Sequence, residues 1–151
     1  MSVDVLFTRS ADVAGEIQSL IRSAAVSIDA ALYRLSHPAL VHALSEAAGR
    51  GVRVRLVLDR GKFQENRFVH GALPQSGIGF RLSDGRRTKA SKMHHKFAVL
   101  DDEIVLTGSY NWTEESQEGN YENLIVLREP ALAEAYIREF EALWQESAAV
   151  L

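Results

Sequence analysis

The sequence predicts a single-domain α/β protein built on a mixed β-sheet with helices on both faces. Three observations lead to this fold class. Strand-like and helix-like segments alternate over residues 1–82, a pattern typical of strands joined by crossover helices. From residue 92 onward the pattern changes to successive strands followed by one helix, which favours antiparallel pairing in the same sheet. The length of 151 residues suits one hydrophobic core, so we expect residues 1–151 to form one domain.

The first part of the chain contains four expected strands. Alternating or β-branched apolar residues mark the strands, and apolar residues at helical spacing mark the helices between them. Ser10 is the expected N-cap of the first helix. Ser36, followed by Pro38, is the expected N-cap of the second. The expected order is strand Val3–Phe7, a helix after Ser10, strand Val26–Leu32, a helix after Ser36 that ends at Gly49–Gly51, strand Val52–Leu58, a weaker helix or loop over 61–76, and strand Ile78–Leu82.

The second part of the chain predicts a hairpin, one more strand and a closing helix. Strands Lys92–Leu100 and Glu103–Thr107 flank the dipeptide Asp101-Asp102, which is the spacing of a two-residue hairpin turn. Glu122–Leu127 is the next expected strand. Pro130 begins the closing helix, whose inward positions are expected to be Leu132, Tyr136, Ile137, Phe140, Leu143 and Trp144.

The composition excludes several kinds of site. Cysteine is absent, which excludes disulfides, thiolate zinc sites, iron–sulfur clusters and cysteine nucleophiles. No segment approaches the roughly 20 apolar residues that a transmembrane helix needs. Asp4 and Asp12 stand where a signal peptide would carry basic and then apolar residues. We therefore expect a cytoplasmic protein that does not bind membranes, unless an upstream segment is missing from the sequence.

The net charge of −3 hides an asymmetry along the chain. Residues 1–100 contain 15 Lys and Arg against 8 Asp and Glu, whereas residues 101–151 contain 2 against 12. The densest basic stretch runs from Arg81 to Lys96. It forms either a solvated loop or an edge that binds a polyanion, and charge alone does not distinguish the two. The candidate substrate-binding cations in it are Arg81, Arg86, Arg87, Lys89 and Lys92.

One short region brings four polar side chains together. Strand side chains alternate between faces, so His94 and Lys96 project together, while His95 faces the core side with its apolar neighbours. Ser109 and Asn111 share a face near the end of the partner strand, and the hairpin places the two pairs at neighbouring positions. An imidazole, an ammonium, a hydroxyl and a carboxamide suit a phosphate, because donors bind its oxygens while the imidazole attacks or transfers a proton.

This region resembles the signature of the phospholipase D superfamily, H-x-K-x4-D followed by G-S-x-N. The first half of the signature alone is expected by chance in about 1% of chains of this length. Ala30–Arg34 and Arg50–Asp59 resemble earlier strands of the family. The resemblance thus covers nearly the whole chain and implies the phospholipase D-like fold. The matching positions are His94, Lys96, Asp101, Gly108, Ser109 and Asn111.

The resemblance also implies a mechanism. In this family the motif histidine attacks phosphorus and forms a phosphohistidine that water resolves, while a second motif histidine protonates the leaving oxygen. This chain has one motif copy, so it is similar to small members that pair as homodimers. His94 is then the nucleophile, and His94 of the partner subunit is the general acid. The mechanism implies no metal or other cofactor, and His37, His42 and His70 have no metal-ligand spacing.

Further roles follow from the same resemblance. Lys96 and Asn111 are expected to bind the non-bridging phosphate oxygens, and Ser109 to add a hydrogen bond. Glu122 matches the family's acidic position that holds the histidine ring and fixes its tautomer. Asp101 is counted with this catalytic set, although at the turn we expect it to order the motif rather than to touch substrate.

The motif predicts phosphodiester chemistry but leaves the substrate open. We expect a metal-independent endonuclease acting on DNA or RNA, because related single-motif members include such enzymes and the basic stretch leads into the catalytic strand. Tyr110 and Trp112 are candidates to stack on a base, with core packing as the equal alternative. A second hypothesis is a phospholipase, since related members hydrolyse cardiolipin, although the sequence shows no membrane anchor or exposed apolar surface. The third is a nucleic-acid-binding module without turnover.

Overall fold

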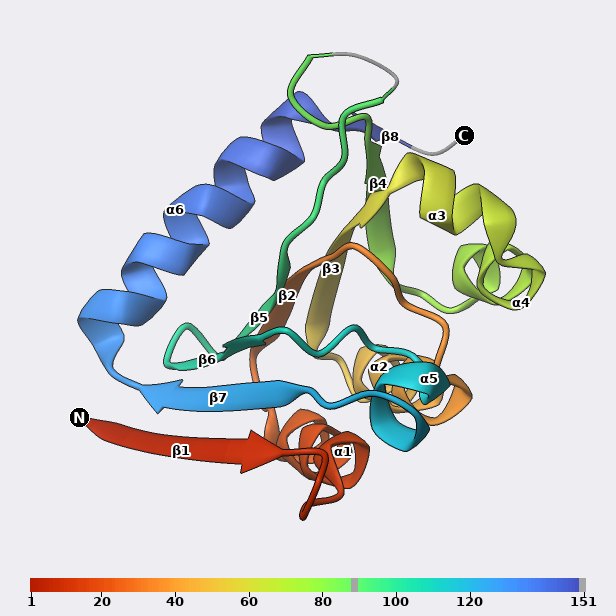
Figure 1. Cartoon of the computed structure of the whole chain (residues 1–151). Helices are drawn as coiled ribbons and strands as arrows, with labels where there is room; N and C mark the ends of the chain where they lie inside the picture. Colours follow the sequence, from red (N-terminus) through yellow and green to blue (C-terminus); the bar gives the residue numbers. More distant parts are fainter. Residues whose placement is uncertain (88–89, 150–151) are drawn as a thin grey trace.

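The strands of the computed structural model form one mixed sheet with helices on both faces, which confirms the predicted fold class (Figure 1). The structure describes residues 1–87 and 90–149. Within them, eight strands lie in the order β1-β7-β6-β5-β2-β3-β4-β8. The β2–β3 and β3–β4 pairs are parallel, and the other neighbouring pairs are antiparallel.

The observed elements follow the expected order, with shifts of one to four residues at several ends. The region expected to be a weak helix or loop forms two short helices and a 3₁₀ turn. A two-residue strand near the C-terminus was not expected. The elements are β1 (Ser2–Phe7), α1 (Val13–Ser23), β2 (Ser27–Leu32), α2 (Pro38–Gly49), β3 (Arg53–Asp59), α3 (Arg60–Glu65), α4 (Arg67–Ala72), η1 (Leu73–Gln75), β4 (Gly79–Ser83), β5 (Lys96–Leu100), β6 (Ile104–Gly108), α5 (Glu114–Glu118), β7 (Asn123–Arg128), α6 (Pro130–Glu146) and β8 (Ala148–Ala149).

Both predicted N-caps were wrong. Asp12 caps α1, because its side chain accepts a hydrogen bond from the Gly15 backbone N–H at 3.0 Å. The Ser10 backbone N–H instead donates to the Phe7 carbonyl in the turn after β1. His37 caps α2, because its ring nitrogen accepts from the Ala39 backbone N–H at 3.2 Å, and the backbone N–H groups of Ser36 and His37 both donate to the Trp112 carbonyl.

The strand predicted from Lys92 begins only at Lys96. Residues 92–95 run beside the sheet without joining it, and backbone contacts with neighbouring elements replace the strand ladder. This matters for function, because the residues just before β5 carry the motif histidine.

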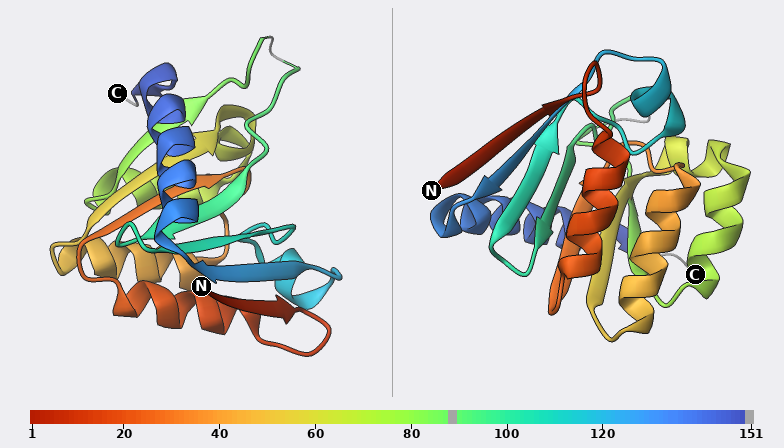
Figure 2. Two further views of the ribbon diagram at one scale, coloured as in Figure 1. Left: turned by 90° about the vertical axis from the view of Figure 1, so that its left-hand side faces the viewer. Right: turned by 90° about the horizontal axis from the view of Figure 1, so that it is seen from below.

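Two apolar layers hold the helices to the sheet. On one face, α1, α2, α3 and α4 pack on buried residues of the central strands. On the other face, α6 alone crosses the sheet and packs through Ala133 and Phe140 (Figure 2). The sheet is therefore covered on both sides at its centre. Under α6, the buried Asp29 of β2 pairs with Arg55 of β3 at 2.8 Å.

Candidate active site

The motif residues gather where β2 ends and β5 begins. Lys96, the first residue of β5, pairs with Leu32, the last residue of β2. One step further, the Tyr33 backbone N–H donates to the His95 carbonyl oxygen at 2.8 Å. This bond continues the backbone pairing past the end of the sheet and holds His94 next to Tyr33.

A buried carboxylate fixes the segment that carries His94. Asp59, the last residue of β3, is only 6% exposed. One of its oxygens accepts from the Met93 backbone N–H at 3.0 Å, and the other accepts from the Lys62 backbone N–H at 3.1 Å, where Asp59 caps α3. Buried backbone donors need such partners. Asp59 therefore ties the residue before His94 to the end of β3.

The imidazole of His94 lies between an ammonium group and an aromatic ring. Lys96 Nζ is 3.2 Å from His94 Nδ1 and 2.8 Å from the His94 carbonyl oxygen. The Tyr33 ring packs on the imidazole with the ring centroids 4.5 Å apart. An ammonium only donates, so Nδ1 accepts and the proton of the neutral ring lies on Nε2.

The surroundings of His94 favour the neutral imidazole. Burial lowers the pKa of His94, and the charges of Lys96 and Lys92 lower it further against the opposite effect of Asp59. Burial also lowers the pKa of Lys96, against the effect of the Glu122 charge. A neutral imidazole is the form that attacks phosphorus, so this environment prepares a nucleophile.

Ser109 and Asn111 follow β6 along the chain. The Ser109 hydroxyl donates to Glu122 at 2.6 Å and accepts from the Asn123 backbone N–H at 3.1 Å. The buried side-chain oxygen of Asn111 has no hydrogen-bond partner within residues 1–87 and 90–149. Buried polar atoms are nearly always paired. The unpaired atom is the amide oxygen, which can only accept a hydrogen bond.

Glu122 does not contact the His94 ring within the chain, contrary to the role that the resemblance implied. One of its oxygens accepts from Ser109, and the other accepts from the Asn120 side chain at 3.1 Å. Nδ1 of the His94 ring faces Lys96. In the single chain, Glu122 supports Ser109.

Asp101 lies at the opposite end of β5 from Lys96 and takes no part in this cluster. Its carboxylate accepts hydrogen bonds from the backbone N–H groups of Ala25, Val26 and Ser27, at 3.0, 2.7 and 3.0 Å. Burial acts to raise the pKa of Asp101, but these three bonds outweigh it and the pKa is lowered. Asp101 thus orders the hairpin, as expected for a residue at the turn.

Three of the candidate substrate-binding residues are used by the fold. Tyr110 and Trp112 are 0% and 1% exposed, so the alternative of core packing is correct and stacking on a base is wrong. The Arg81 guanidinium donates to the Trp144 carbonyl at 2.7 Å and lies over its ring at 4.2 Å. It anchors α6 and is not brought to His94.

The rest of the basic stretch is only partly gathered at the site. Arg86 and Lys92 line a cavity of about 430 Å³ that also contains His94. Lys92 further lines a cavity of about 610 Å³ that includes Tyr33 and Asp59. Arg87 is exposed and lines neither cavity. Lys89 lies outside the described residues.

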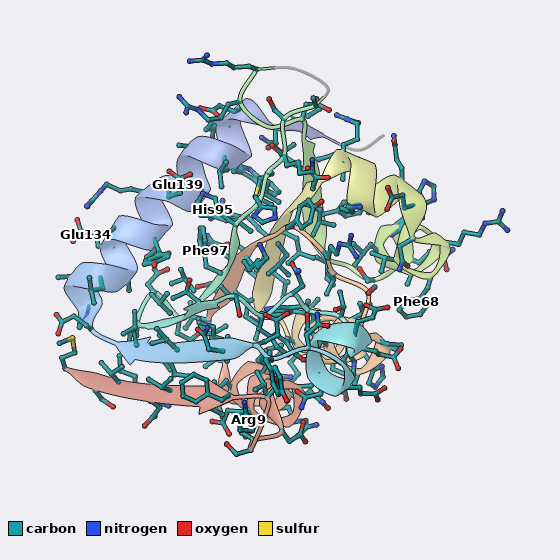
Figure 3. All side chains as sticks on the ribbon, viewed as in Figure 1. Arg9, Phe68, His95, Phe97, Glu134 and Glu139 are labelled. Carbon is teal, nitrogen blue, oxygen red and sulfur yellow. The ribbon has the colours of Figure 1, made fainter. Side chains whose placement is uncertain are left out.

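His95 lies on the α6 side of the sheet, as the alternation predicted, but it is not buried. Its ring nitrogen is 3.0 Å from Glu139 of α6, and its ring packs edge-on against Phe97 at 5.2 Å (Figure 3). The side chain is 47% exposed. His95 therefore links the catalytic segment to α6 from outside the core.

The sequence interpretation missed residues outside the motif that surround His94. Tyr33 and Asp59 end or follow the parallel strands β2 and β3, and Lys62 lies in the first turn of α3. Ligands in α/β folds bind at the carboxyl ends of parallel strands. Applying that rule to the two predicted strands would have pointed to Tyr33 and Asp59.

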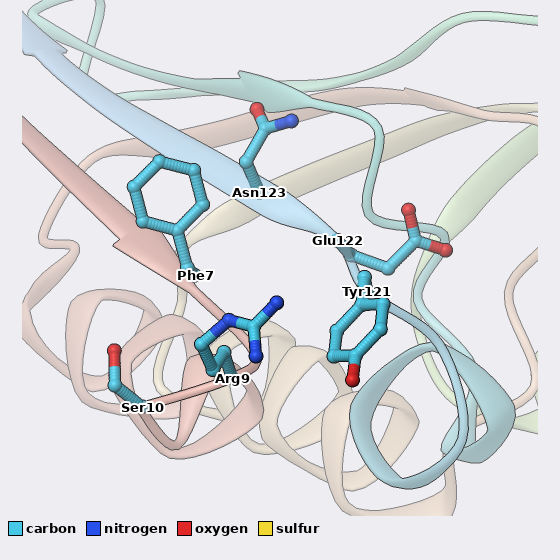
Figure 4. Close-up of a pocket in the computed structure, with 6 residues that line it drawn as sticks. All are labelled: Phe7, Arg9, Ser10, Tyr121, Glu122 and Asn123. Carbon is cyan, nitrogen blue, oxygen red and sulfur yellow. The ribbon is translucent and has the colours of Figure 1, made fainter.

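A separate hollow lies at the end of β1 (Figure 4). It has a volume of about 450 Å³ and is lined in part by Phe7, Arg9, Tyr121 and Glu122. The Arg9 guanidinium lies 4.5 Å from the centre of the exposed Tyr121 ring. Glu122 connects this hollow to Ser109 and so to the motif.

An exposed apolar strip leads along β1 to this hollow, contrary to the expectation that the protein has no such surface. Val3, Val5 and Phe7 alternate along the edge strand and are 47%, 52% and 55% exposed. Alternate residues point to one face of a strand. We call these three side chains the β1 strip.

Within residues 1–87 and 90–149, no three His, Asp or Glu side chains are grouped in a way that could hold a metal ion. Over the same ranges, no helix is both long enough and apolar enough to cross a membrane.

Comparisons with known proteins agree with this geometry. The family described as "Cardiolipin synthase, PLD-like domain" matches residues 17–144. A mitochondrial cardiolipin hydrolase of Xenopus tropicalis is 36% identical over 127 residues, which are 84% of this chain and 59% of the relative. The human protein of that name is 34% identical over 82% of this chain and 48% of its own length. The chain therefore spans about half the length of these curated relatives.

Solved structures give close matches to the whole fold. The phospholipase D family member Nuc from Salmonella typhimurium superposes with a TM-score of 0.88 at 29% identity, covering 99% of this chain and 97% of Nuc. NucT from Helicobacter pylori gives the same TM-score at 24% identity, covering 99% of this chain and all of NucT.

Proposed function

This chain belongs to the phospholipase D superfamily, and we propose that it is a metal-independent endonuclease that hydrolyses phosphodiesters of DNA or RNA through a phosphohistidine. The observation that carries the proposal is the contact between His94 and Lys96 beside Tyr33. It joins a neutral imidazole to a fixed cation, the pair needed to attack phosphorus and to bind its oxygens.

The proposed reaction has two steps. The His94 imidazole attacks phosphorus, and the P–O bond to the leaving nucleotide breaks. The leaving oxygen takes its proton from the protonated His94 of the partner subunit, which becomes neutral. Water then attacks the phosphohistidine and gives a proton to that neutral ring, the P–N bond breaks, and both imidazoles are restored.

Substrate binding would adjust the tautomer of the nucleophile. In the free chain, the Lys96 ammonium donates a hydrogen bond to His94 Nδ1, so the ring proton lies on Nε2. A phosphate oxygen is a stronger acceptor for an ammonium than an imidazole nitrogen. The incoming phosphate therefore draws Lys96 away, Nδ1 takes up the proton, and Nε2 becomes free to attack. We assign the second contact with the phosphate oxygens to the side-chain NH₂ group of Asn111, since its side-chain oxygen only accepts.

The mechanism needs two imidazoles, and the chain has one motif histidine. We propose a homodimer in which His94 and His94 of the partner subunit meet at a two-fold axis. The β1 strip supports this assembly, because an exposed apolar surface on a soluble enzyme commonly marks an interface. It leads to the hollow that contains Glu122, so it adjoins the motif.

The charge and polarity around His94 favour a nucleic acid over a lipid. The two cavities that adjoin the site are lined largely by charged and polar side chains. Among the described residues that line each cavity, cations such as Arg86, Lys62 and Lys92 are equal in number to the carboxylates. A diacylated substrate needs apolar contacts for its chains, whereas a nucleic acid needs cations along its backbone.

Cardiolipin hydrolysis is the second candidate function. Relatives with 34–36% identity carry the name mitochondrial cardiolipin hydrolase, and the β1 strip could rest on a lipid surface as well as on a second subunit. The cytoplasmic location stays a prediction. The mitochondrion is its alternative, and fractionation of cells expressing the protein would distinguish them.

One assay separates the candidates. Purified protein and His94→Ala are each incubated with single- and double-stranded DNA, RNA and cardiolipin vesicles in excess EDTA. Nucleic-acid cleavage that persists in EDTA and disappears in the variant supports the nuclease. Turnover of lipid alone would establish the second candidate. Binding of nucleic acid without turnover would leave a non-catalytic binding module.

A further inference from the structure

Three cations converge on one aromatic ring at the edge of the site. The Tyr33 ring centre lies 5.4 Å from Lys96 Nζ, 5.8 Å from Lys62 Nζ and 5.7 Å from Arg34 Cζ. Cations are attracted to an aromatic face. Tyr33 is 7% exposed and packs on the His94 ring. It therefore gathers positive charge directly beside the reacting imidazole.

Carboxylates do not balance this cluster. Lys62 pairs with Glu65 at 3.2 Å. Neither Arg34 nor Lys96 forms an ion pair anywhere in residues 1–87 and 90–149. Like charges held close together repel one another, although water screens the exposed Arg34. An anionic ligand spanning the cluster would remove that repulsion.

Arg34 and Lys62 also line a groove outside the motif. It has a volume of about 170 Å³, and Ser36 and Asn66 add neutral donors to its wall. Asn66 uses its side-chain oxygen to cap α4, which leaves its NH₂ group as a donor. The wall also includes Glu115 and the Glu65 that pairs with Lys62. The groove thus offers several donors to one oxyanion.

We propose that Arg34 and Lys62 form a second phosphate subsite, which holds the phosphate next to the scissile one on a nucleic-acid strand. This inference rests on the proposed function and deepens it. Lys96 binds the phosphate under attack, while Lys62 and Arg34 bind its neighbour on the far side of Tyr33. The bound nucleic-acid strand then runs from His94 over the start of α3, rather than only along the basic stretch before β5.

Binding measurements on the His94→Ala protein test the subsite without cleavage of the ligand. The probes are an oligothymidylate of eight nucleotides and a thymidine dinucleoside monophosphate, which has a single phosphate. Arg34→Gln and Lys62→Gln are compared with Arg22→Gln. Arg22 is an exposed cation in the last turn of α1, near the residues that Asp101 binds at the other end of β5.

We expect Arg34→Gln and Lys62→Gln each to weaken octanucleotide binding about 5- to 20-fold at low salt, and to reduce the slope of log affinity against log salt by about 0.7. Binding of the dinucleoside monophosphate should weaken less than about twofold, since it has no second phosphate. Arg22→Gln should change neither. Glu65→Gln should tighten octanucleotide binding about two- to fivefold, because it releases Lys62 from its carboxylate.

Equal weakening of both ligands would overturn the inference, because the two cations would then act at the scissile phosphate. No weakening of either would also overturn it and place the strand elsewhere. If the variants weaken binding only to cardiolipin vesicles, the second phosphate belongs to a lipid and the assignment to nucleic acid is wrong.

The same variants in the His94 protein separate this inference from the proposed function. If Arg34→Gln and Lys62→Gln lose cleavage of the octanucleotide but not of the dinucleoside monophosphate, both the proposed function and the subsite are supported. If the His94 protein cleaves no phosphodiester but the binding pattern holds, the proposed function fails and the subsite stands. If cleavage occurs and the variants bind and cleave like the unsubstituted protein, the subsite alone fails.

Discussion

The two ends of β5 hold the two halves of the H-x-K-x4-D motif, and they differ in how well their charged side chains are paired. At the Asp101 end, one carboxylate accepts three backbone hydrogen bonds. At the Lys96 end, a half-buried ammonium has no carboxylate within ion-pair distance in the described chain, and its contacts are to the His94 ring and carbonyl. The unpaired buried oxygens, Ser27 Oγ and Asn111 Oδ1, do not separate the two ends, because Ser27 lies beside Asp101. One motif therefore combines a completed structural contact with an incomplete site.

The difference teaches that motif membership does not define a single role. A group whose hydrogen bonds are complete in the free protein contributes to folding, whereas groups left incomplete in a charged cluster are available to substrate. Substitutions at the two ends should then separate activity from stability.

The largest expected effect is the loss of activity in Lys96→Gln. Removing a cation that binds the reacting phosphate should lower kcat about 100- to 1,000-fold. The melting temperature should stay the same or rise, because burial lowers the pKa of Lys96 and so makes its charged form costly in the folded protein. Steady-state kinetics and thermal unfolding on one preparation check this. A comparable loss of stability would remove the distinction between the two ends.

Asp101→Asn should show the opposite behaviour. The charged carboxylate would no longer accept hydrogen bonds from three backbone N–H groups, so the free energy of unfolding should fall by about 1 to 3 kcal/mol. At temperatures below the unfolding transition, kcat should change little. Asp102→Asn is the matched control, since both positions have positive φ, 53° and 57°, that Asn tolerates.

The Asp101 effect should also depend on pH. The pKa of Asp101 is lowered in the folded protein, so its stabilisation is fully present above its ordinary value of 3.8 and is lost as the pH falls through the folded value. The stability difference between the protein and Asp101→Asn should therefore shrink in acid. A difference that is constant with pH would contradict this account.

Asp59→Asn tests whether the histidine end is positioned from outside the motif. Weakening the buried contact to the Met93 backbone should lower kcat/KM about 5- to 50-fold, because the imidazole is no longer held in place. Asp59 also acts to raise the pKa of His94. Removing its charge should move the His94 titration, followed by NMR of the ring, to lower pH. If activity falls but the His94 titration does not move, Asp59 would have only a folding role.

The smallest expected effect is the titration shift in Lys92→Gln. The charge of Lys92 lowers the pKa of His94, so its removal should move the ring titration to higher pH, opposite to Asp59→Asn. The acidic limb of the activity profile should move in the same direction, because less neutral imidazole is present at a given acidic pH. His94→Ala identifies the His94 resonance, because that resonance is absent from its spectrum. No movement, or movement to lower pH, would contradict the assignment.

The fold was largely accessible from the sequence, because apolar periodicity reports which face of each element is buried. The type and order of the major elements were predicted correctly. The errors arose where tertiary contacts override local signals. The Trp112 carbonyl fixes the backbone of Ser36 and His37 before α2, and Asp59 holds the Met93 backbone before β5. Neither long-range contact leaves a local pattern.

The site was accessible only in part. The motif located His94 and Lys96, whose side chains are in contact, whereas the placement of Ser109 and Asn111 beside them stays a prediction. Basic residues could not be sorted by spacing alone, because a guanidinium such as Arg81 serves the fold as readily as a ligand. Tyr33 carries no charge, and only its place at the end of a parallel strand indicated a role.

The central claim is that one active site contains the imidazole of two subunits. Differently tagged His94 and His94→Ala chains, mixed in equal amounts and allowed to exchange, test it most directly. A shared site leaves activity only in dimers with two imidazoles, and random exchange makes these about one quarter of all dimers. The activity of the mixture, per total chain, should therefore be about one quarter of that of the pure His94 protein. Retention of about one half would mean that each chain works alone and would contradict the account.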